Sequence, residues 1–331
     1  MTSQIKRARA RLAAQKLSPS AAADDHVPQW RPPAGEVDPA VVLAPRAGLG
    51  RRRVLAAAGL AVAVAAGAVV TVNQVLGSST ATVPTPPLLA LQPAAAGADP
   101  VAALRELADR ARRQPSLAGE GPVLYSERAQ WSFVTNRNTK GEFLGSELAQ
   151  TRIQSWLGPD GAGREIRAMT GHGALPPLER PLTGQPYAPG TDPAALVAQF
   201  RAEGQGQPAH WWLEATLRWG PQLHSPATAS AFLQVLAEQP GIRTAGRTTD
   251  RAGRPATVFS VTRHLPGDRF PDLELYLLLD PDTGLLLGTE SVALTADTQE
   301  RGYSVATPAT TDYLLWEYAA RVPDLTSQPR R

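Results

Sequence analysis

Two aspartates at the end of an apolar run form the most chemically suggestive pair in the chain. Asp280 and Asp282 lie within LELYLLLDPDTGLLLGTES, residues 273–291. A phosphatase of the aspartyl-phosphate type would carry a Thr or Ser two residues after the second Asp, and a helix would follow. Here Thr283 comes one residue after Asp282, and the next segment is strand-like. Pro presets φ in turns, Asp bonds to nearby backbone and Gly tolerates positive φ. The pair is therefore predicted to form the corner of a hairpin.

Other residue types that catalyse reactions or bind metals are sparse. The chain has no cysteine, which excludes disulfides, thiolate catalysis and cysteine-ligated metals. His172, His210, His224 and His264 lack the spacing with Glu of a zinc-protease helix. Neither a G-x-S-x-G elbow nor a G-x-x-x-x-G-K phosphate loop occurs. The sequence thus predicts no catalytic residue, no metal and no cofactor. A hydrolase whose His and Asp residues converge in space stays open.

The most aromatic patch of the chain is His210-Trp211-Trp212 together with Trp219. Trp211 or Trp212 can share a helical face with Ala215 and Trp219. Aromatic residues at helical spacing ordinarily pack in a core, and this interpretation is favoured. The alternative is an amphipathic lid over a lipid or acyl-chain groove. Trp211, Trp212 and Trp219 are accordingly the candidate residues for binding a ligand or partner.

Local signals indicate helices and hairpins that would position such residues. Asp99-Pro100, Asp192-Pro193 and Ser225-Pro226 predict helix starts, because Pro at the first helical position lacks only an N–H that would go unbonded. The third helix is expected to stop at Pro240-Gly241. Strand patterns follow, and they are listed here by range: a strand at 123–134 and hairpins at 149–169, 241–264 and 273–291. Strands in runs, without βαβ alternation, predict an α+β fold in which an antiparallel sheet is packed by a few helices.

The charge distribution divides the chain at residue 53. Residues 1–53 hold ten Lys/Arg and four Asp/Glu, a net charge of +6, whereas the remainder holds 23 bases and 26 acids. The segment Val54–Val72 between them carries no charge. It would span roughly 28 Å as a helix, close to the hydrocarbon core of about 30 Å. We expect one transmembrane helix at 54–76.

Arginines border only one end of this segment. Arg51, Arg52 and Arg53 precede it, and the next base on the other side is Arg105. The positive-inside rule then places the N-terminus in the cytoplasm and residues 77–331 outside the cell membrane. A buried soluble helix and a cleaved twin-arginine signal are the alternatives. The second is disfavoured because 53 residues are a long front region for a signal.

The tail at 1–53 is predicted to be basic and largely disordered. Its segment Ile5–Leu17 could form an amphipathic helix that docks on a cytoplasmic protein partner or on anionic lipid. A solvated tail that only sets topology is the favoured interpretation. Since no DNA- or RNA-binding motif accompanies the charge, no nucleic-acid partner is expected. Residues 77–98, uncharged and with four prolines, predict a Pro/Ala-rich linker. Residues 99–331 would form the extracytoplasmic domain.

Four stretches carry a family resemblance. TRIQSWLGPDGAGREIR, TDPAALVAQFRAE, FLQVLAEQPGIRTAGRTTDRAGRPATVFSV and LELYLLLDPDTGLLLGTE together resemble actinobacterial single-pass membrane proteins associated with extracytoplasmic-function sigma factors. The hairpins are also similar to the curved antiparallel sheets of lipoprotein carriers and of periplasmic regulators of anti-sigma factors. The resemblance implies a curved sheet and brings no catalytic residues. The tail departs from a full anti-sigma domain, because it is short, proline-broken and without His/Cys zinc ligands.

These features favour a non-enzymatic, membrane-anchored envelope protein. Its outer domain would bind a ligand or a protein partner, as a sensor or regulator linked to sigma-factor signalling. Lipid or lipoprotein binding by the curved sheet is the first alternative. A secreted or anchored hydrolase is the second.

Overall fold

The computed structural model describes residues 81–140, 142–147, 150–169, 176–183, 192–298 and 301–329. Within these ranges no helix has both the length and the apolar character needed to cross a bilayer. The span predicted at 54–76, the tail at 1–53 and the three arginines Arg51, Arg52 and Arg53 lie outside the described residues.

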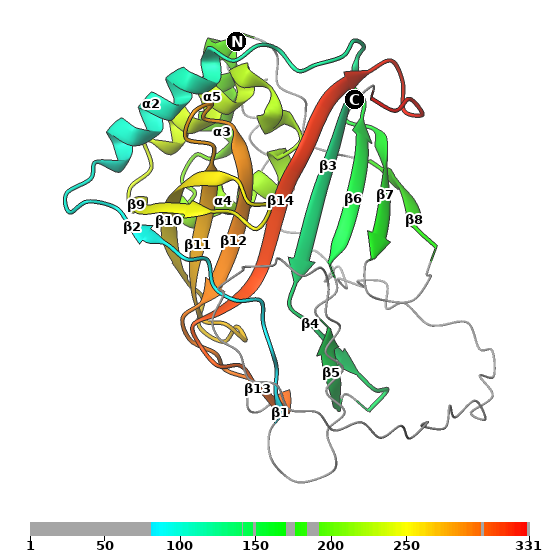
Figure 1. The fold of residues 1–331 in the computed structure, drawn as a ribbon, viewed down its shortest axis with the longest axis vertical. Coiled ribbons are helices and arrows are strands. Elements are labelled where there is room, and N and C mark those ends of the chain that lie inside the picture. The colour runs from blue at the N-terminus through cyan, green and yellow to red at the C-terminus, as the bar shows by residue number, and fades with distance from the viewer. Residues whose placement is uncertain are drawn as a thin grey trace, which may run out of the picture. The chain divides into compact units, whose positions relative to one another are not determined.

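One ten-stranded sheet holds most of the strands, and all its neighbouring strands are antiparallel. In spatial order they are β2 (Gln92–Pro93), β9 (Arg243–Thr249), β10 (Pro255–His264), β11 (Asp272–Leu279), β12 (Leu286–Ala293), β14 (Ala309–Val322), β3 (Val123–Ser132), β6 (Thr151–Leu157), β7 (Gly163–Met169) and β8 (Leu178–Leu182). Figure 1 shows β14, in red, running between β12 and β3. Two short pairs lie outside this sheet: β1 (Ala81–Thr82) with β13 (Tyr303–Ser304), and β4 (Val134–Arg137) with β5 (Phe143–Glu147).

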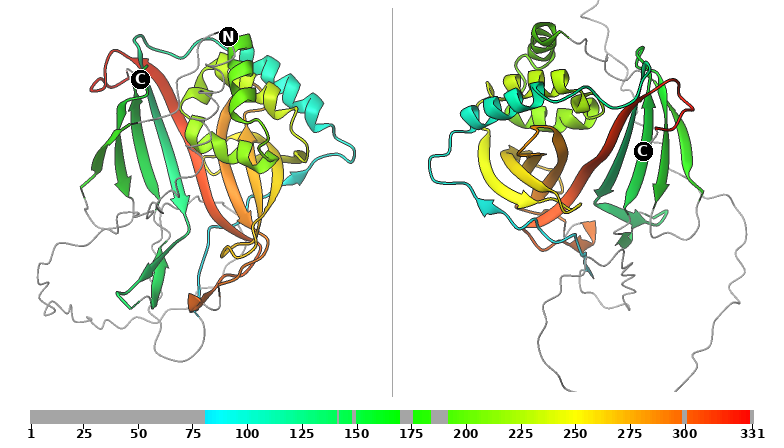
Figure 2. Two further views of the ribbon diagram at one scale, coloured as in Figure 1. Left: turned by 180° about the vertical axis from the view of Figure 1, so that it is seen from behind. Right: turned by 45° about the horizontal axis from the view of Figure 1, so that its top comes forward.

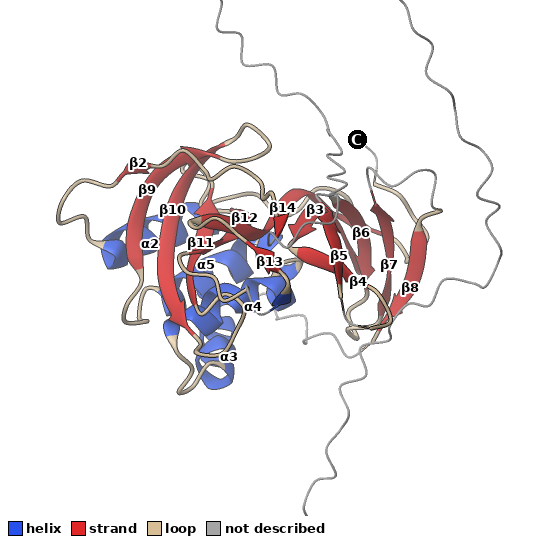
Figure 3. Ribbon diagram, turned by 90° about the horizontal axis from the view of Figure 1, so that it is seen from below, coloured by secondary structure: helices blue, strands red, loops and turns tan. Residues whose placement is uncertain are grey.

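The described chain has four α-helices, which lie against one face of the sheet. They are α2 (Pro100–Arg112), α3 (Pro193–Glu203), α4 (Ala209–Trp219) and α5 (Pro226–Leu236), with a 3-10 turn η1 (Gln222–His224) before α5. Figure 2 shows them packed on β9–β12, while β3, β6, β7 and β8 extend past them. Figure 3 shows the same arrangement from below. The predicted α+β class, with a mainly antiparallel sheet and a few helices, is confirmed for the described residues.

The helix starts agree with their local chemistry in two cases of three. The Asp99 carboxylate accepts a first-turn N–H at 2.8 Å, and the Asp192 carboxylate does so at 3.1 Å. Ser225 holds the N-cap position of α5, but its side chain makes no capping bond there. That helix ends at Leu236, before the Pro240-Gly241 stop that the sequence suggests. Asp is thus the more dependable cap in this chain.

All three predicted hairpins are present, as β6–β7, β9–β10 and β11–β12. In the second, the Asp250 carboxylate accepts the backbone N–H of Ala252 at 2.9 Å and of Arg254 at 2.8 Å. The turn at Asp250 therefore has the side-chain-to-backbone bonds that its sequence predicts.

Residues 81–98 correct part of the linker prediction, because this segment forms two short strands, β1 outside the large sheet and β2 at its edge, instead of a free spacer. β1 pairs with β13, and β2 extends the edge of the sheet at β9. Leu89 and Leu91 pack on a cluster of four buried residues on the sheet face away from the helices: Ala256, Val258, Leu278 and Leu287. The Thr248 hydroxyl donates to the Ala90 carbonyl at 3.0 Å. Burial of these leucines outweighs the expected freedom of a Pro-rich segment.

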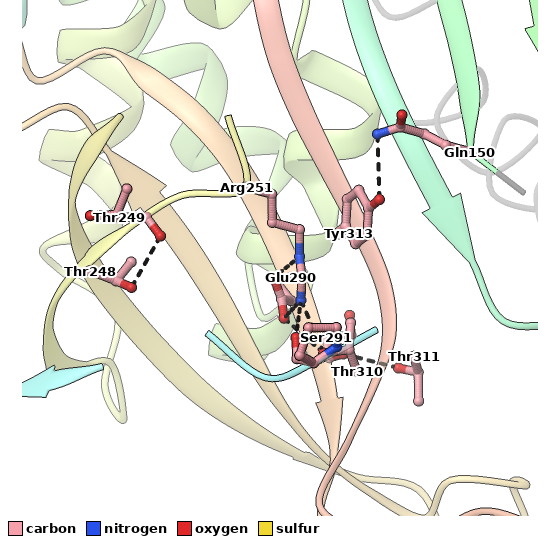
Figure 4. A network of polar contacts seen from close by, with 10 residues as sticks. Gln150, Thr248, Thr249, Arg251, Glu290, Ser291, Thr310, Thr311 and Tyr313 are labelled. Carbon is pink, nitrogen blue, oxygen red and sulfur yellow. Dashed lines mark hydrogen bonds and ion pairs between the residues drawn. The ribbon is translucent and has the colours of Figure 1, made fainter. Parts of the chain in front are cut away.

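The ion pair between Arg251 and Glu290 also holds the segment 81–98 against the sheet (Figure 4). Arg251 donates to the two oxygens of Glu290 at 2.9 and 2.6 Å. Its guanidinium also donates to the Pro87 carbonyl at 2.8 Å and lies 4.6 Å from the ring centre of Tyr313. Thr310 completes the network with a 2.9 Å bond to Glu290. Burial raises the pKa of Glu290, against the pull of Arg251. The network therefore joins the N-terminal segment to β12 and β14.

Candidate functional site

The Asp280 and Asp282 pair is a turn, as predicted. The Asp280 carboxylate accepts the backbone N–H of Asp282 at 2.8 Å and of Thr283 at 2.9 Å. Gly284 donates its N–H to the Asp280 carbonyl at 2.8 Å and has φ +72°. The Asp280 carboxylate is thus committed to holding the hairpin, and the two residues do not form a catalytic pair.

The histidines are dispersed. His264 lies 2.5 Å from the Asp272 carboxylate in an exposed pair, which Thr295 extends with a 2.7 Å bond. His224 packs edge-on against Trp316, with ring centres 5.1 Å apart, and burial lowers its pKa to about 4. No group of three His, Asp or Glu side chains suited to a metal occurs in the ranges that the structure describes. His172 lies outside those ranges.

The three candidate tryptophans all come from α4, and they pack within the core. Trp212 and Trp219 are each 2% exposed. Trp219 meets Phe200 edge-on at 5.2 Å between ring centres. Trp211 is partly buried and lies edge-on to Trp212 at 5.1 Å. This placement matches the core-packing interpretation, and none of the three lines the groove described next.

The opposite side of α4 forms one wall of a groove of about 540 Å³. Leu213, Glu214 and Leu217 face it, and the Leu217 side chain is 52% exposed. Residues i, i+3 and i+4 share one side of an α-helix, so Leu217 lies beside both Leu213 and Glu214. α4 is therefore apolar on two sides, one for the core and one for the groove.

Strands β10, β11, β12 and β14 supply the floor of the groove, with Ser132 at the end of β3. Leu273 and Leu275 give it an apolar part. Next to this lies a polar part, where Ser291 pairs across the sheet with Asp312. Strand residues spaced by two share a face, which explains why these side chains all meet the helix side of the sheet. The groove combines an apolar strip with polar groups.

Charged residues of both signs close one end of the groove. Arg263 donates to Glu214 on α4 at 2.9 Å and to Asp268 at 3.4 Å. Arg269 donates to the Phe133 carbonyl at 3.1 Å. Arg263 thus links α4, β10 and the following loop at this end of the groove.

Asp312 on the groove floor has a perturbed carboxyl. Burial raises the pKa of its carboxyl above the ordinary 3.8, and Glu214 adds to the shift. A hydrogen bond with Ser291 and the charges of Arg263 and Arg269 oppose it. A carboxyl group with a raised pKa is an indicator of a functional site when it lies in a cleft. The arrangement suits binding of a polar group beside an apolar one, and it offers no nucleophile with an adjacent base.

The tryptophans named from the sequence and the groove lie on different sides of α4. The groove residues Glu214, Leu217, Arg263 and Asp312 are not among the residues named from the sequence. Leu213 and Leu217 are spaced i, i+4 away from the tryptophan face, which is a detectable signal for a second apolar face. Nothing in the sequence brings Asp312 to Arg263, because that proximity depends on the pairing of distant strands.

No protein-family model matches the sequence, and no curated protein matches it. Among solved structures, a crystal structure of MucB is 20% identical with a TM-score of 0.29 and is matched over 71% of this chain and 62% of its own. A complex of Pseudomonas aeruginosa MucA and MucB is 17% identical with a TM-score of 0.27, over 70% and 62%. MucB in complex with MucA(peri) is 18% identical with a TM-score of 0.26, over 68% and 57%. The chain thus spans less than two thirds of the MucB chains, and at these TM-scores the likeness does not establish a shared fold.

Gly204 tests the packing of Trp212. A Cβ added at Gly204 would lie 1.9 Å from the Trp212 ring, and φ there is −91°, so the conflict is steric and not conformational. Gly204→Ala is expected to lower the free energy of unfolding by about 1–3 kcal/mol, the usual cost of overpacking, measured by denaturant titration of the full chain. In a Trp212→Phe background the cost should shrink, because the smaller ring leaves room. An equal cost in both backgrounds would contradict the contact.

Asp312 predicts a pH dependence. Because its folded pKa is raised, its contribution to the free energy of unfolding is greatest below its ordinary value of 3.8 and is lost as pH rises through the folded pKa. Asp312→Asn should leave stability at pH ~7 unchanged or higher and should flatten its slope above pH ~4. Exposed Asp297, outside the groove, gives the control substitution Asp297→Asn. A strong loss of stability at neutral pH in Asp312→Asn alone would mean that the carboxylate is a stabilising ion-pair partner.

Proposed function

We propose that this chain is a non-enzymatic binding protein whose groove under α4 takes up a segment of a protein partner. The carrying observation is the groove itself, a hollow of about 540 Å³ with an exposed leucine on its wall. Ligand sites of this size are typical of small-molecule and peptide binding. The lining offers hydrophobic contact and hydrogen-bonding groups but no assembled catalytic machinery among the described residues.

The mixture of groups favours a protein segment over a lipid. An acyl chain requires a continuous apolar tunnel, whereas here the apolar strip of Leu217, Leu273 and Leu275 ends against Arg263 and Asp312. A peptide supplies an apolar side chain together with backbone amides and carbonyls that can pair with both charge types. A partner segment with one large apolar residue flanked by polar groups fits this lining.

The cellular setting of the proposal comes from the sequence. The uncharged segment at 54–76 would anchor the chain in the membrane, with the groove outside and the basic tail inside. Binding outside and a tail inside would suit a sensor or regulator. The link to extracytoplasmic-function sigma factors rests on the resemblance of the hairpin motifs and on this layout.

Photo-crosslinking tests the groove directly. A benzoylphenylalanine replacing Leu217 should form a discrete adduct in living cells, because the side chain at this position points into the occupied groove. Leu144, 65% exposed and outside the groove, gives the matched control position. Mass spectrometry of the adduct distinguishes a protein from a lipid. If Leu217 and Leu144 give the same diffuse products, or if Leu217 gives none, the groove is not the binding site.

The absence of cysteine makes topology easy to measure. Ser3→Cys places a single thiol in the tail, and Glu120→Cys places one at an exposed position of the outer domain. A membrane-impermeant maleimide added to intact cells is expected to label only the second variant, and lysis should expose both. Labelling of Ser3→Cys in intact cells, or protection of Glu120→Cys, would overturn the proposed orientation.

A further inference from the structure

The sheet extension beyond the helices carries a cluster of three arginines around one carboxylate. The Glu165 side chain on β7 is 2% exposed. Arg128 from β3 donates to it at 2.8 Å and Arg180 from β8 at 2.9 Å, and Arg167 two residues along β7 donates to it as well. The four residues of the cluster are all absent from the lining of the α4 groove, although β3 contributes residues to both places.

The cluster contains more positive than negative charge among the described residues. Glu165 is the one acid in the described part of the chain that forms an ion pair with any of the three arginines, which leaves an excess of two positive charges. Burial lowers the pKa of Arg128, and repulsion by Arg167 and Arg180 adds to this. Burial alone would raise the pKa of Glu165, but the Arg167 hydrogen bond and the three positive charges lower it. Uncompensated charge at a partly buried site is costly.

Several guanidinium donors in the cluster remain available. Arg167 and Arg180 each use Nε for Glu165, so the terminal NH₂ groups of both can bind another acceptor. Their side chains are 34% and 48% exposed. The Arg128 Nε is enclosed and has no hydrogen-bond partner among the described residues. Glu165 therefore holds two guanidiniums in place while their outer ends face solvent.

A small hollow lies beside these donors on the same face of the sheet. It measures about 130 Å³ and is lined by Arg167, Ile153, Met169 and Thr151, among others. Register pairs Arg128 with Ile153 and Ile153 with Arg167, so the hollow adjoins the cluster directly. Its volume corresponds to about four water molecules, enough for a small organic group next to a bound anion.

We propose that Arg167 and Arg180, held by Glu165, form a binding site for a dianionic oxyanion of the phosphomonoester type. Two guanidiniums offer paired donors that match phosphate oxygens, and charge-assisted bonds of this kind are among the strongest in proteins. A dianion neutralises the excess of two charges, which a single carboxylate cannot do. The organic part of the phosphomonoester lies in the hollow.

Titration of the full chain in detergent with inorganic phosphate tests the site, with calorimetry as the readout. Saturable binding that weakens with added salt is expected, and sulfate should compete while acetate should be weaker because it carries one charge. Arg180→Gln and Arg167→Gln should each reduce affinity about tenfold or more. Arg152→Gln is the matched control, because Arg152 is an exposed arginine on β6 that pairs with Glu317 instead.

Three results would overturn the proposed phosphate site. No saturable phosphate binding, equal weakening by Arg152→Gln, or acetate binding as tight as phosphate would overturn the proposal. Detergent micelles with and without phosphatidic acid identify the source: phosphate-competed binding that requires phosphatidic acid indicates a lipid headgroup, and phosphate binding that phosphatidic acid does not affect indicates a soluble phosphomonoester. Neither result depends on the α4 groove, so this site and the proposed function fail or stand independently.

Discussion

The pairing of β14 along both of its edges is the constraint from which the rest of the described structure follows. One edge pairs with β12 over Ala309–Leu315, and the other pairs with β3 over Asp312–Val322. This strand thereby joins the helix-covered strands to the extension of β3, β6, β7 and β8. It also sets Asp312 on the groove floor, and it sets Trp316 opposite Arg128. β14 thus supplies part of the groove floor and lies next to β3, the strand that carries Arg128.

The groove also depends on the position of α4, which lies close to the sheet but leaves a hollow between them. Indole packing of Trp212 and Trp219 fixes the helix from the core side, and Gly204 leaves room for one of these rings. The Arg263 ion pair with Glu214 fixes it from the groove side. Hydrophobic burial supplies most of the stability, and the Arg263–Glu214 ion pair adds a contact between α4 and β10 beside the groove. Under the proposed function, a partner would meet a wall that is already formed.

Helix caps and turns, which depend on a few neighbouring residues, could be predicted from the sequence. The pairing of strands that are distant in the sequence could not. Asp-Pro caps and Asp-Gly turns act over four or five residues, so α2, α3 and the hairpins could be inferred from the sequence. β14 could not, because its partner β3 lies almost two hundred residues away and no local signal specifies the register. The segment at 81–98 was expected to be free because of its prolines, yet Leu89 and Leu91 alternate as an edge segment would. On α4, the tryptophans are the stronger sequence signal, and they lie on the buried face. Leu217, a weaker signal, lies on the face that lines the groove.

The central claim is that the space between α4 and the sheet is occupied by a partner in the cell. Hydrogen–deuterium exchange of the chain in an extract of the cells that produce it, compared with the purified chain, tests this most directly. Slower exchange in the extract at 209–219 and 263–275, with unchanged exchange in the β6–β7 hairpin, is the result that our account predicts. Identical exchange at 209–219 and 263–275 in the two preparations would contradict it.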